Sequence, residues 1–372
     1  MDIEKFFIEK LYDDSNNEMK IIIDKLINNA RLSSVDAIFL YEKAPLEVLA
    51  FLSNKKRKKL HGEKVFFNRN FHIEPTNVCL YNCKFCSYYR KTGQEGAWEL
   101  EMHEVLEKVN FYADQPVTEV HITGGVHPKY NLEFYCKLFQ NIKAIKPGIQ
   151  IKALTVVEIE YLAELEKISI EETLKLLKSN GLDSLPGGGA EIFDAEVRKQ
   201  ICQDKTSGEI WLEIHKKAHE LDILSNATML YGHIEKYEHR VDHMNRLREL
   251  QDKTGGFQAF IPLKFKNKNN NLSSVHEIPL IEDLRNYAVA RLFLDNILHL
   301  KAYWVMLGKE DTELALSFGV DDMDGTIENS TKIYSMAGAK DQSPSMSYDE
   351  IKKFIEKAGR IPVERDTFYH AI

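Results

Sequence analysis

From residue 64 onward, short apolar runs alternate with longer stretches of helical periodicity, and this alternation constrains the fold more than any other feature of the sequence. Strands that alternate with helices form parallel sheets, because each helix carries the chain back across the sheet. Eight candidate strands predict an α/β fold of the TIM type, a closed (β/α)8 barrel of roughly 250 residues. The candidates are residues 71–74, 118–122, 149–154, 182–185, 226–230, 257–261, 301–305 and 314–318.

The same pattern divides the chain into three regions. Apolar residues at helical spacing predict an N-terminal helical layer over residues 1–62. The barrel takes residues 63–330, and a C-terminal helical extension takes residues 331–372, where Ser347 is a good N-cap for a final helix. Crossover helices are predicted over residues 99–112, 132–145, 170–180, 209–222, 239–252 and 280–295.

Composition and the N-terminus exclude several classes of protein. Of the 372 residues, 44% are hydrophobic, which is enough to bury a large core. The 49 basic and 57 acidic residues give a net charge of −8, which argues against a nucleic-acid partner. Acidic residues follow Met1 directly, whereas a signal peptide begins with basic residues and an apolar run. No apolar run in the sequence approaches the length of a membrane span. We therefore expect a cytoplasmic protein with no membrane partner.

Three of the five cysteines fall within eight residues, in the loop after the first candidate strand. Cys79, Cys83 and Cys86 have the spacing C-x3-C-x2-C, and thiolates suit zinc or iron–sulfur centres. Structural zinc needs four closed ligands, whereas a cubane cluster on three cysteines leaves one iron open to an outside ligand. The spacing favours a [4Fe-4S] cluster over zinc with a nearby histidine or three unrelated thiols.

Two glycine-rich loops follow other candidate strands. The first contains Gly124 and Gly125, and two glycines alone usually mark a tight turn. The second, residues 185–192, is not a dinucleotide-binding fingerprint, because Ile192 takes the third glycine position. It is either a flexible turn or part of a site at the carboxyl end of the barrel, which Glu191 would then line. His233 follows the fifth candidate strand. It is either a proton carrier at the site or an exposed loop histidine.

The cysteine motif and the first glycine loop together resemble the radical S-adenosylmethionine (SAM) superfamily. The resemblance implies that Cys79, Cys83 and Cys86 hold a [4Fe-4S] cluster whose fourth iron binds SAM. It implies that Phe85 lies against the SAM adenine. A reduced cluster splits SAM into methionine and a 5′-deoxyadenosyl radical, so an electron donor such as a flavodoxin or ferredoxin is implied as a partner.

The resemblance also implies roles for the loops that follow later strands. Gly124 and Gly125 would bind the methionine part of SAM, and Glu191 would accept hydrogen bonds from the SAM ribose or act on the substrate. His233 would manage protons during the reaction, since an imidazole titrates near neutral pH.

Five segments resemble the enzymes of the futalosine pathway of menaquinone biosynthesis: residues 83–90, 123–128, 185–192, 301–308 and 319–326. The resemblance implies a small-molecule substrate, the enolpyruvyl ether of 3-hydroxybenzoate, to which the adenosyl radical adds, so that SAM is consumed as a second substrate. The loop at residues 124–128 and the run at residues 321–326 favour this reaction over that of the sister cyclase. That cyclase, a deazaflavin-pathway relative and a non-catalytic metal-binding scaffold are the alternatives.

The two carboxylates of that substrate need cationic or hydrogen-bonding partners. The sequence offers Arg90, His127, Arg198 and Arg291 as candidates and does not rank them.

Overall fold

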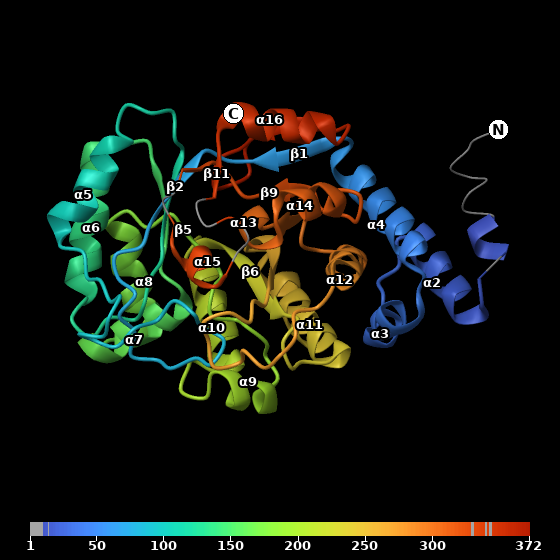
Figure 1. Cartoon of the computed structure of the whole chain (residues 1–372), viewed down its shortest axis with the longest axis horizontal. Coiled ribbons are helices and arrows are strands. Elements are labelled where there is room, and N and C mark those ends of the chain that lie inside the picture. The colour runs from blue at the N-terminus through green and yellow to red at the C-terminus, as the bar shows by residue number, and fades with distance from the viewer. Residues whose placement is uncertain (1–9, 14, 329–330, 339–340, 342–343) are drawn as a thin grey trace.

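The computed structural model describes residues 10–13, 15–328, 331–338, 341 and 344–372, and ten of its strands form one curled sheet (Figure 1). The order is β12-β1-β9-β8-β7-β6-β5-β4-β3-β2, and every pairing in this sheet is parallel. The strands are β1 (Lys64–Phe67), β2 (Asn70–Ile73), β3 (Glu119–Ile122), β4 (Gln150–Ala153), β5 (Ser184–Leu185), β6 (Leu224–Tyr231), β7 (Phe257–Lys264), β8 (His299–Ala302), β9 (Asp322–Met323) and β12 (Ile361–Glu364). The predicted α/β barrel is confirmed.

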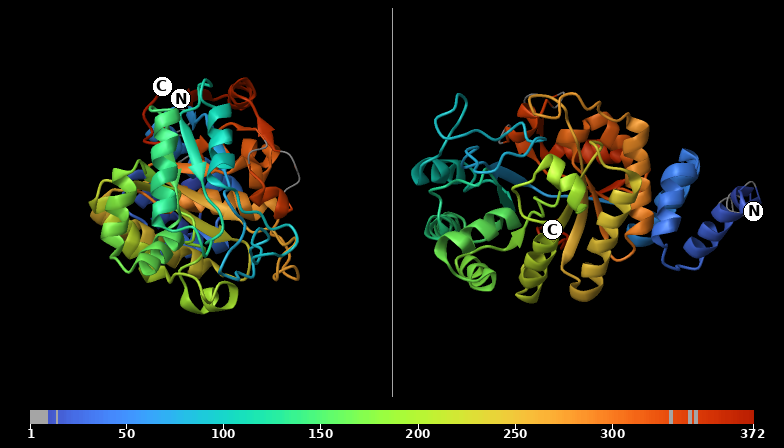
Figure 2. Two further views of the ribbon diagram at one scale, coloured as in Figure 1. Left: turned by 90° about the vertical axis from the view of Figure 1, so that its left-hand side faces the viewer. Right: turned by 90° about the horizontal axis from the view of Figure 1, so that it is seen from below.

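Helices surround this sheet, and the N-terminal helices stand at one side of it (Figure 2). Helices α3 and α4 contact α11 and α12, so the predicted N-terminal layer packs on the barrel. The helices are α2 (Asn17–Ile27), α3 (Ser34–Lys43), α4 (Leu46–His61), α5 (Met102–Phe111), α6 (Leu132–Ile145), α7 (Val156–Glu166), α8 (Ile170–Ser179), α9 (Ala195–Ile201), α10 (Gly208–Glu220), α11 (Tyr237–Thr254), α12 (Leu280–Phe293), α13 (Trp304–Leu307), α14 (Lys309–Ala315), α15 (Ile333–Met336) and α16 (Tyr348–Lys357). A small antiparallel pair, β10 (Ile327–Glu328) and β11 (Ser345–Met346), lies outside the main sheet.

Strands β1 and β2 are two halves of one stretch of chain, and together they close the barrel. β1 pairs with β9, whereas β2 pairs with β3 at the other edge of the sheet. Thr326 joins the halves: its backbone N–H donates to the Asn68 carbonyl at 3.1 Å, and its hydroxyl donates to the Asn70 carbonyl at 3.1 Å. The same hydroxyl accepts from the Asn70 N–H at 3.2 Å. Backbone groups left over by the break in the strand are therefore satisfied.

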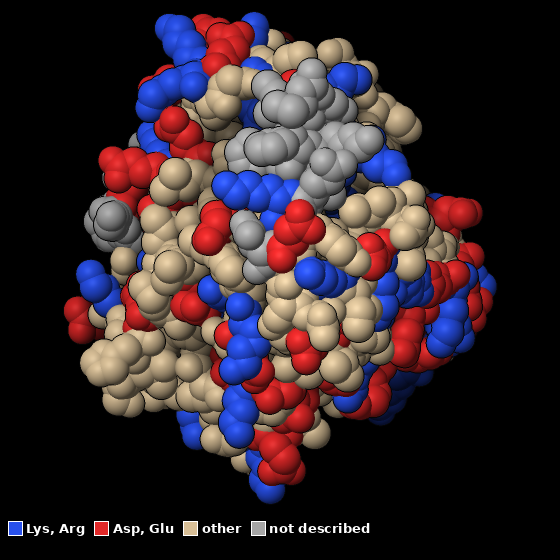
Figure 3. All heavy atoms as spheres, turned by 90° about the vertical axis from the view of Figure 1, so that its right-hand side faces the viewer, with Lys and Arg blue, Asp and Glu red and all other residues tan. Residues whose placement is uncertain are grey.

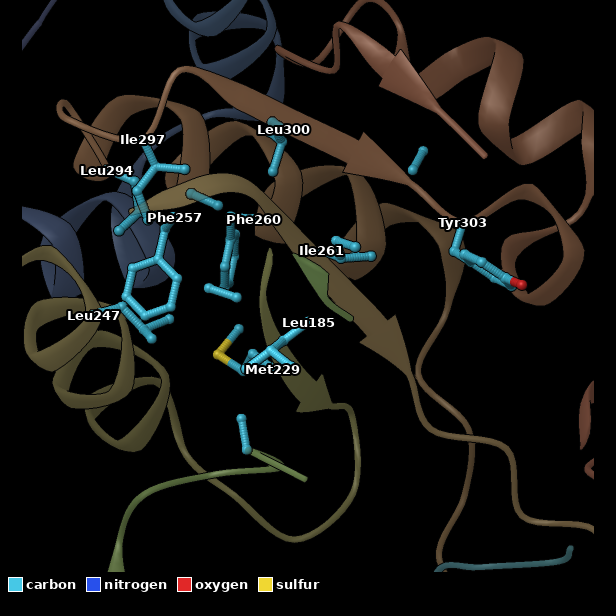
Figure 4. Packing of buried hydrophobic residues seen from close by; sticks show 14 of the residues in the cluster. Leu185, Met229, Leu247, Phe257, Phe260, Ile261, Leu294, Ile297, Leu300 and Tyr303 are labelled. Carbon is cyan, nitrogen blue, oxygen red and sulfur yellow. The ribbon is translucent and has the colours of Figure 1, made fainter. Parts of the chain in front are cut away.

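The interior of the sheet is apolar in one part and charged in another. Figure 4 shows the apolar packing around β6, β7 and β8, in which Leu185, Met229 and Phe260 are almost fully buried. Each such side chain stabilises the fold by roughly 1.5–3 kcal/mol. On β3 and β4, by contrast, the buried Glu119 carboxylate binds the buried Lys152 ammonium at 2.6 Å.

The segment after β12 lies at the amino end of the barrel, where these charges meet. The Arg365 guanidinium binds the Asp322 carboxylate at 2.8 Å, and both side chains are fully buried. The Thr367 hydroxyl donates to Glu119, and the Thr367 N–H donates to the Gln150 side chain at 2.6 Å. The C-terminal segment thus seals this end with paired polar groups.

Two sequence predictions about segments are wrong. Residues 314–318 were expected to be a strand, but they overlap the end of α14 and the turn after it, and the strand is β9. The apolar alternation there imitates a strand, while the charged Asp322 hides the real one. The C-terminal region is also not wholly helical, because it supplies β12 to the sheet.

The outer surface mixes charges of both signs. Figure 3 shows the side of the molecule that carries the N-terminal helices, where basic and acidic side chains are intermixed. Within the described part of the chain, no helix is both long enough and apolar enough to cross a membrane.

Candidate functional site

A cavity of about 300 Å³ lies at the carboxyl ends of the strands, where barrel enzymes have their sites. The loops after β2, β3 and β5 line it, together with the ends of β6 and β7. Seven of the eight site residues expected from the sequence line this one cavity. They are Cys79, Cys83, Phe85, Cys86, Gly124, Gly125 and Glu191.

The three cysteines are held by a loop that folds back on itself. The Cys79 N–H donates to the Arg90 carbonyl at 3.0 Å, and the Cys86 N–H donates to the Cys83 carbonyl at 3.1 Å. All three thiols are free of disulfides. Burial raises the pKa of the Cys83 and Cys86 thiols, so their thiolate forms need a cationic partner. Three thiols on the wall of one cavity, one buried and two half-buried, are the donor set that an iron–sulfur cluster requires.

The arrangement of the cysteines bears on whether they hold a cluster or a single zinc ion. Two thiolates on one tetrahedral zinc lie about 3.8 Å apart, given Zn–S bonds of roughly 2.3 Å. Among the described residues, the one group of three ligand atoms within 4.8 Å of one another is His61, His299 and Asp321, at the other end of the barrel. The three cysteines do not form such a group with a fourth ligand, and three thiolates without a fourth ligand suit the cubane better than a closed structural zinc site.

Gly124 and Gly125 lie directly against the cysteine loop. A Cβ atom on Gly125 would stand 2.2 Å from the Val78 carbonyl oxygen and 3.0 Å from Cys79 Cβ, and a Cβ on Gly124 would stand 2.7 Å from the Thr76 carbonyl oxygen. The Gly125 N–H also donates to that Thr76 carbonyl at 2.9 Å. The sequence explained these glycines by close approach of a ligand, and the structure adds close approach of the cysteine loop itself.

Glu191 lines the cavity from a turn with positive φ, +47°. Its backbone carbonyl accepts from the Leu230 N–H at 2.8 Å, and its carboxylate accepts from Lys205 Nζ at 2.6 Å. Burial opposes the charge of Lys205, but the Glu191 carboxylate outweighs it and raises the pKa of that ammonium. The sequence did not single out Lys205, which reaches the cavity from a loop between α9 and α10.

His233 is not among the residues that line the cavity, contrary to its expected position after the fifth candidate strand. The chain turns at Gly232, where φ is +85°, and buries the imidazole beside the strand end. His233 Nδ1 lies 3.1 Å from the Glu235 carboxylate, and Nε2 lies 3.2 Å from the Leu230 carbonyl. Burial lowers the pKa of His233.

The four side chains expected to bind substrate carboxylates do not line the 300 Å³ cavity either. Arg90 donates to the Tyr89 carbonyl at 2.8 Å, and His127 lies 3.2 Å from the Glu99 carboxylate. Arg198 donates to the Ala190 carbonyl at 2.6 Å and so braces the turn that holds Glu191. Arg291 lies at the amino end of the barrel and binds Asp321. Each one is occupied by the protein itself.

The cationic side chains that line the cavity are three lysines, and each has a carboxylate partner. Lys205 is paired with Glu191, as described. Lys264 Nζ lies 2.5 Å from Asp283, and Lys266 Nζ lies 3.0 Å from Glu277. Lys266 follows the end of β7 and has the longest of the three ion pairs, so its charge is the most readily shared with a ligand.

His121, on β3, is the other polar residue that the sequence left without a role. It lines the cavity, and its Nε2 is buried with no hydrogen-bond partner among the described residues. Burial, together with the neighbouring His72, lowers the pKa of His121 to about 3, so the imidazole is neutral. Because this atom both lacks a protein partner and borders the cavity, it is available to a ligand there. The signal was visible in the sequence, two residues before Thr123 in the first glycine loop.

Models of known protein families match both halves of the chain. Residues 73–247 match the family model of the radical SAM superfamily, and residues 254–372 match that of the CofH/MqnC C-terminal region. The chain belongs to the radical SAM superfamily. Aminodeoxyfutalosine synthase of Thermus thermophilus is 44% identical over 355 residues, covering 94% of this chain and 95% of that protein.

Two further comparisons define how far the likeness extends. Cyclic dehypoxanthine futalosine synthase of Streptomyces coelicolor is 37% identical, over 95% of this chain and 88% of that protein. Among solved structures, methylornithine synthase has a TM-score of 0.74 at 18% identity, covering 91% of this chain and 96% of that one. The latter likeness supports the barrel fold alone.

Proposed function

We propose that this chain is an aminodeoxyfutalosine synthase of futalosine-pathway menaquinone biosynthesis. The reaction joins the 5′-deoxyadenosyl group of SAM to the enolpyruvyl ether of 3-hydroxybenzoate, with loss of one carboxylate, and forms 6-amino-6-deoxyfutalosine. The observation that carries the proposal is the 44% identity with the Thermus enzyme over 94% of the chain. The cavity supports the proposal, because the cysteines, glycines and glutamate expected to bind the cofactors all line it.

A [4Fe-4S] cluster on Cys79, Cys83 and Cys86 would supply the electron that cleaves bound SAM. The protein's own contribution would be to position SAM beside the cluster. Phe85 offers an apolar face for the adenine, and its ring already lies 5.7 Å from Lys205 Nζ. The loop of Gly124 and Gly125, pressed against the cysteine loop, would hold the methionine part next to the open iron.

The Glu191–Lys205 pair would hold the ribose of SAM. Glu191 is fixed by its positive φ and by the backbone bond to Leu230, so its carboxylate has one direction in which to accept hydroxyl hydrogen bonds. Lys205 donates to one oxygen of that carboxylate and leaves the other free for a ligand. We therefore assign Glu191 to cofactor binding rather than to proton transfer.

Other polar groups on the cavity wall would recognise the substrate. The dianionic substrate needs cations or N–H donors, and Lys264, Lys266 and the neutral His121 line the cavity. Lys266 would bind one carboxylate by sharing the charge that it now directs to Glu277. His121 Nε2 would donate to, or accept from, the substrate at the floor of the cavity.

The test is anaerobic turnover with SAM, dithionite and the enolpyruvyl ether, followed by product mass. Release of methionine and a product with the mass of aminodeoxyfutalosine supports the proposal. No product from this ether, with product from the substrate of the cyclase instead, assigns the chain to the sister reaction. Zinc without labile sulfide in reconstituted protein supports the metal-binding scaffold.

A further inference from the structure

Part of the wall of the 300 Å³ cavity comes from the C-terminal region, and no step of the proposed function uses it. Residues 331–338, which include α15, supply Ile333 and Ala337 to the lining. We call these residues the α15 segment. Figure 1 shows α15 in front of the strands of the sheet. Because both lining side chains are apolar, this part of the wall offers a surface for the ring of the substrate rather than for its carboxylates.

Glu74 binds the first residues of the α15 segment. It directly follows β2 and begins the loop that carries the cysteines, and its side chain is buried. The carboxylate accepts from the Thr331 hydroxyl at 2.6 Å and from the Ile333 N–H at 3.2 Å. The Lys332 N–H lies 3.1 Å from one carboxylate oxygen and 3.0 Å from the other. Three donors of one segment therefore converge on one carboxylate.

The buried carboxylate and the α15 segment stabilise each other. A buried carboxylate is costly unless hydrogen bonds satisfy it, and the segment provides such bonds here. Hydrogen bonds to an ionised group are roughly twice as strong as those between neutral groups. Release of the segment would remove all three donors at once. Glu74 therefore favours the position in which Ile333 and Ala337 line the cavity.

Further contacts hold the α15 segment to the loops around the cysteines. The side-chain amide of Asn269, in the loop after β7, donates to the Met336 carbonyl at 3.0 Å. Lys332 Nζ lies 4.9 Å from the centre of the Trp98 ring, and the Trp98 indole N–H donates to the Glu74 carbonyl at 3.1 Å. The segment is thus bound near both of its ends, and Glu74 joins it to the strand that precedes the cysteines.

We propose that Glu74 is a positioning residue of the reaction, which holds the α15 segment as the wall against which the substrate ring lies. The proposal rests on the proposed function for the substrate, and it adds a residue outside the cavity lining. A closed wall keeps the substrate beside the cofactor and keeps water and reductant out. An adenosyl radical that misses the substrate takes a hydrogen atom from another donor and leaves as 5′-deoxyadenosine. The position of the segment therefore sets how much of the cleaved SAM becomes product.

The first experiment measures the position of the segment without turnover. Thr331→Val removes one donor on the segment and alters no residue of the cysteine loop, and Glu74→Ala removes the acceptor. Thr173→Val is the matched control, since the buried Thr173 hydroxyl on α8 donates to the Ser169 carbonyl at 3.0 Å. Hydrogen–deuterium exchange of the reconstituted holoenzyme follows the amides of residues 331–338. We expect exchange to be roughly tenfold faster in Thr331→Val, faster still in Glu74→Ala and unchanged in Thr173→Val.

The second experiment measures the coupling of SAM cleavage to product formation. Each holoenzyme receives SAM, dithionite and the enolpyruvyl ether, and product and 5′-deoxyadenosine are measured together. In Glu74→Ala, we expect product per SAM cleaved to fall roughly tenfold and the KM for the ether to rise by a similar factor. Thr331→Val should show smaller changes in the same direction. Its SAM affinity and its iron and sulfide content should match those of the wild type.

Unchanged exchange in both variants overturns the proposal, because Glu74 then does not hold the segment. Faster exchange with normal coupling also overturns it, because the segment is then not the wall for the substrate. Loss of iron and sulfide in Thr331→Val would assign the contact to the cluster instead. A wild-type protein that forms a different product refutes the proposed function separately. In that case, faster exchange and less product per SAM cleaved, on the substrate that does react, would still support the role of Glu74.

Discussion

The two ends of the barrel treat their buried polar groups in opposite ways. At the amino end, charged side chains meet opposite charges: Arg365 binds Asp322 at 2.8 Å, and Arg291 binds Asp321. At the carboxyl end, His121 Nε2 has no partner in the described part of the chain, and the cysteine thiols are free. The same strands thus end in one face where charges are paired around the C-terminal segment and in another where the unpartnered His121 Nε2 borders a cavity. In barrels of this type, the amino end contributes mainly to stability and the carboxyl end contributes the binding site.

The largest effect should come from the carboxyl end. We expect Cys83→Ala to abolish cluster assembly and product formation, because the cluster loses one of its three thiolates. Cluster assembly is measured as iron and labile sulfide after anaerobic reconstitution. Product formation is measured by mass spectrometry. Cys136→Ala, on α6, should keep both. A full cluster in Cys83→Ala would mean that this end does not hold it.

A substitution at the amino end should instead lower the free energy of unfolding. Asp321→Asn leaves the buried Arg291 without its carboxylate, which we expect to cost about 3–5 kcal/mol in the free energy of unfolding. Urea unfolding measures the loss, and product formed per folded molecule should not change. Glu209→Gln is the control, because its exposed pair with Arg246 should contribute less than about 1 kcal/mol. A loss of turnover in the folded Asp321→Asn protein would erase the distinction between the two ends.

Acid should weaken the amino end through Asp321. Burial opposes the charge of Asp321, but Arg291 and His299 outweigh it and lower the pKa of that carboxyl from 3.8 to about 2. The stability that it contributes is therefore complete above pH 3.8 and is lost as the pH falls toward 2. This loss is about 2 kcal/mol. The difference in unfolding free energy between the wild type and Asp321→Asn should shrink by this amount as the pH falls through this range, and a constant difference would contradict the assignment.

A smaller effect is expected for the lysine after β7. Lys266→Ala removes a cation from the cavity wall, so the KM for the enolpyruvyl ether should rise roughly tenfold, the lower limit for a hydrogen bond to a charged group. SAM affinity, measured by titration, should stay the same, and Lys253→Ala should behave as the wild type. An unchanged KM would move carboxylate binding to His121 and Lys264.

The smallest effect on chemistry is expected for His233. Because its imidazole lies beside Glu235 and outside the cavity lining, His233→Ala should leave product per SAM cleaved close to that of the wild type, whereas loss of an acid–base catalyst would lower it at least about a hundredfold. Product and 5′-deoxyadenosine are measured together. A larger loss, with SAM cleavage retained, would restore the proton-carrier role predicted from the sequence.

The sequence was sufficient where local pattern decides the outcome. Helix α6 has the predicted bounds, 132–145, because an apolar face and the Asn131 cap define it locally. The cysteine spacing likewise places Cys79, Cys83 and Cys86 on one cavity. Strand β9 was missed because its residue Asp322 is charged, and only the distant Arg365 makes its burial tolerable.

Loop residues were less predictable for a related reason. Lys205 reaches the cavity because Glu191, 14 positions earlier, faces it across the turn. His233 follows a strand end, as expected, but the turn at Gly232 directs it away from the lining. Neither outcome is contained in the local pattern, because each depends on how separate loops pack.

The divided first strand also sets an order of assembly. During synthesis, β2 can pair with β3 as soon as residue 122 has emerged, so the cysteine loop gains its support early. β1 must wait for β9 and β12, at residues 322–323 and 361–364, and contacts this distant in sequence form slowly. Until then the nascent chain is an open trough with a bare β1 edge, which is a target for mispairing.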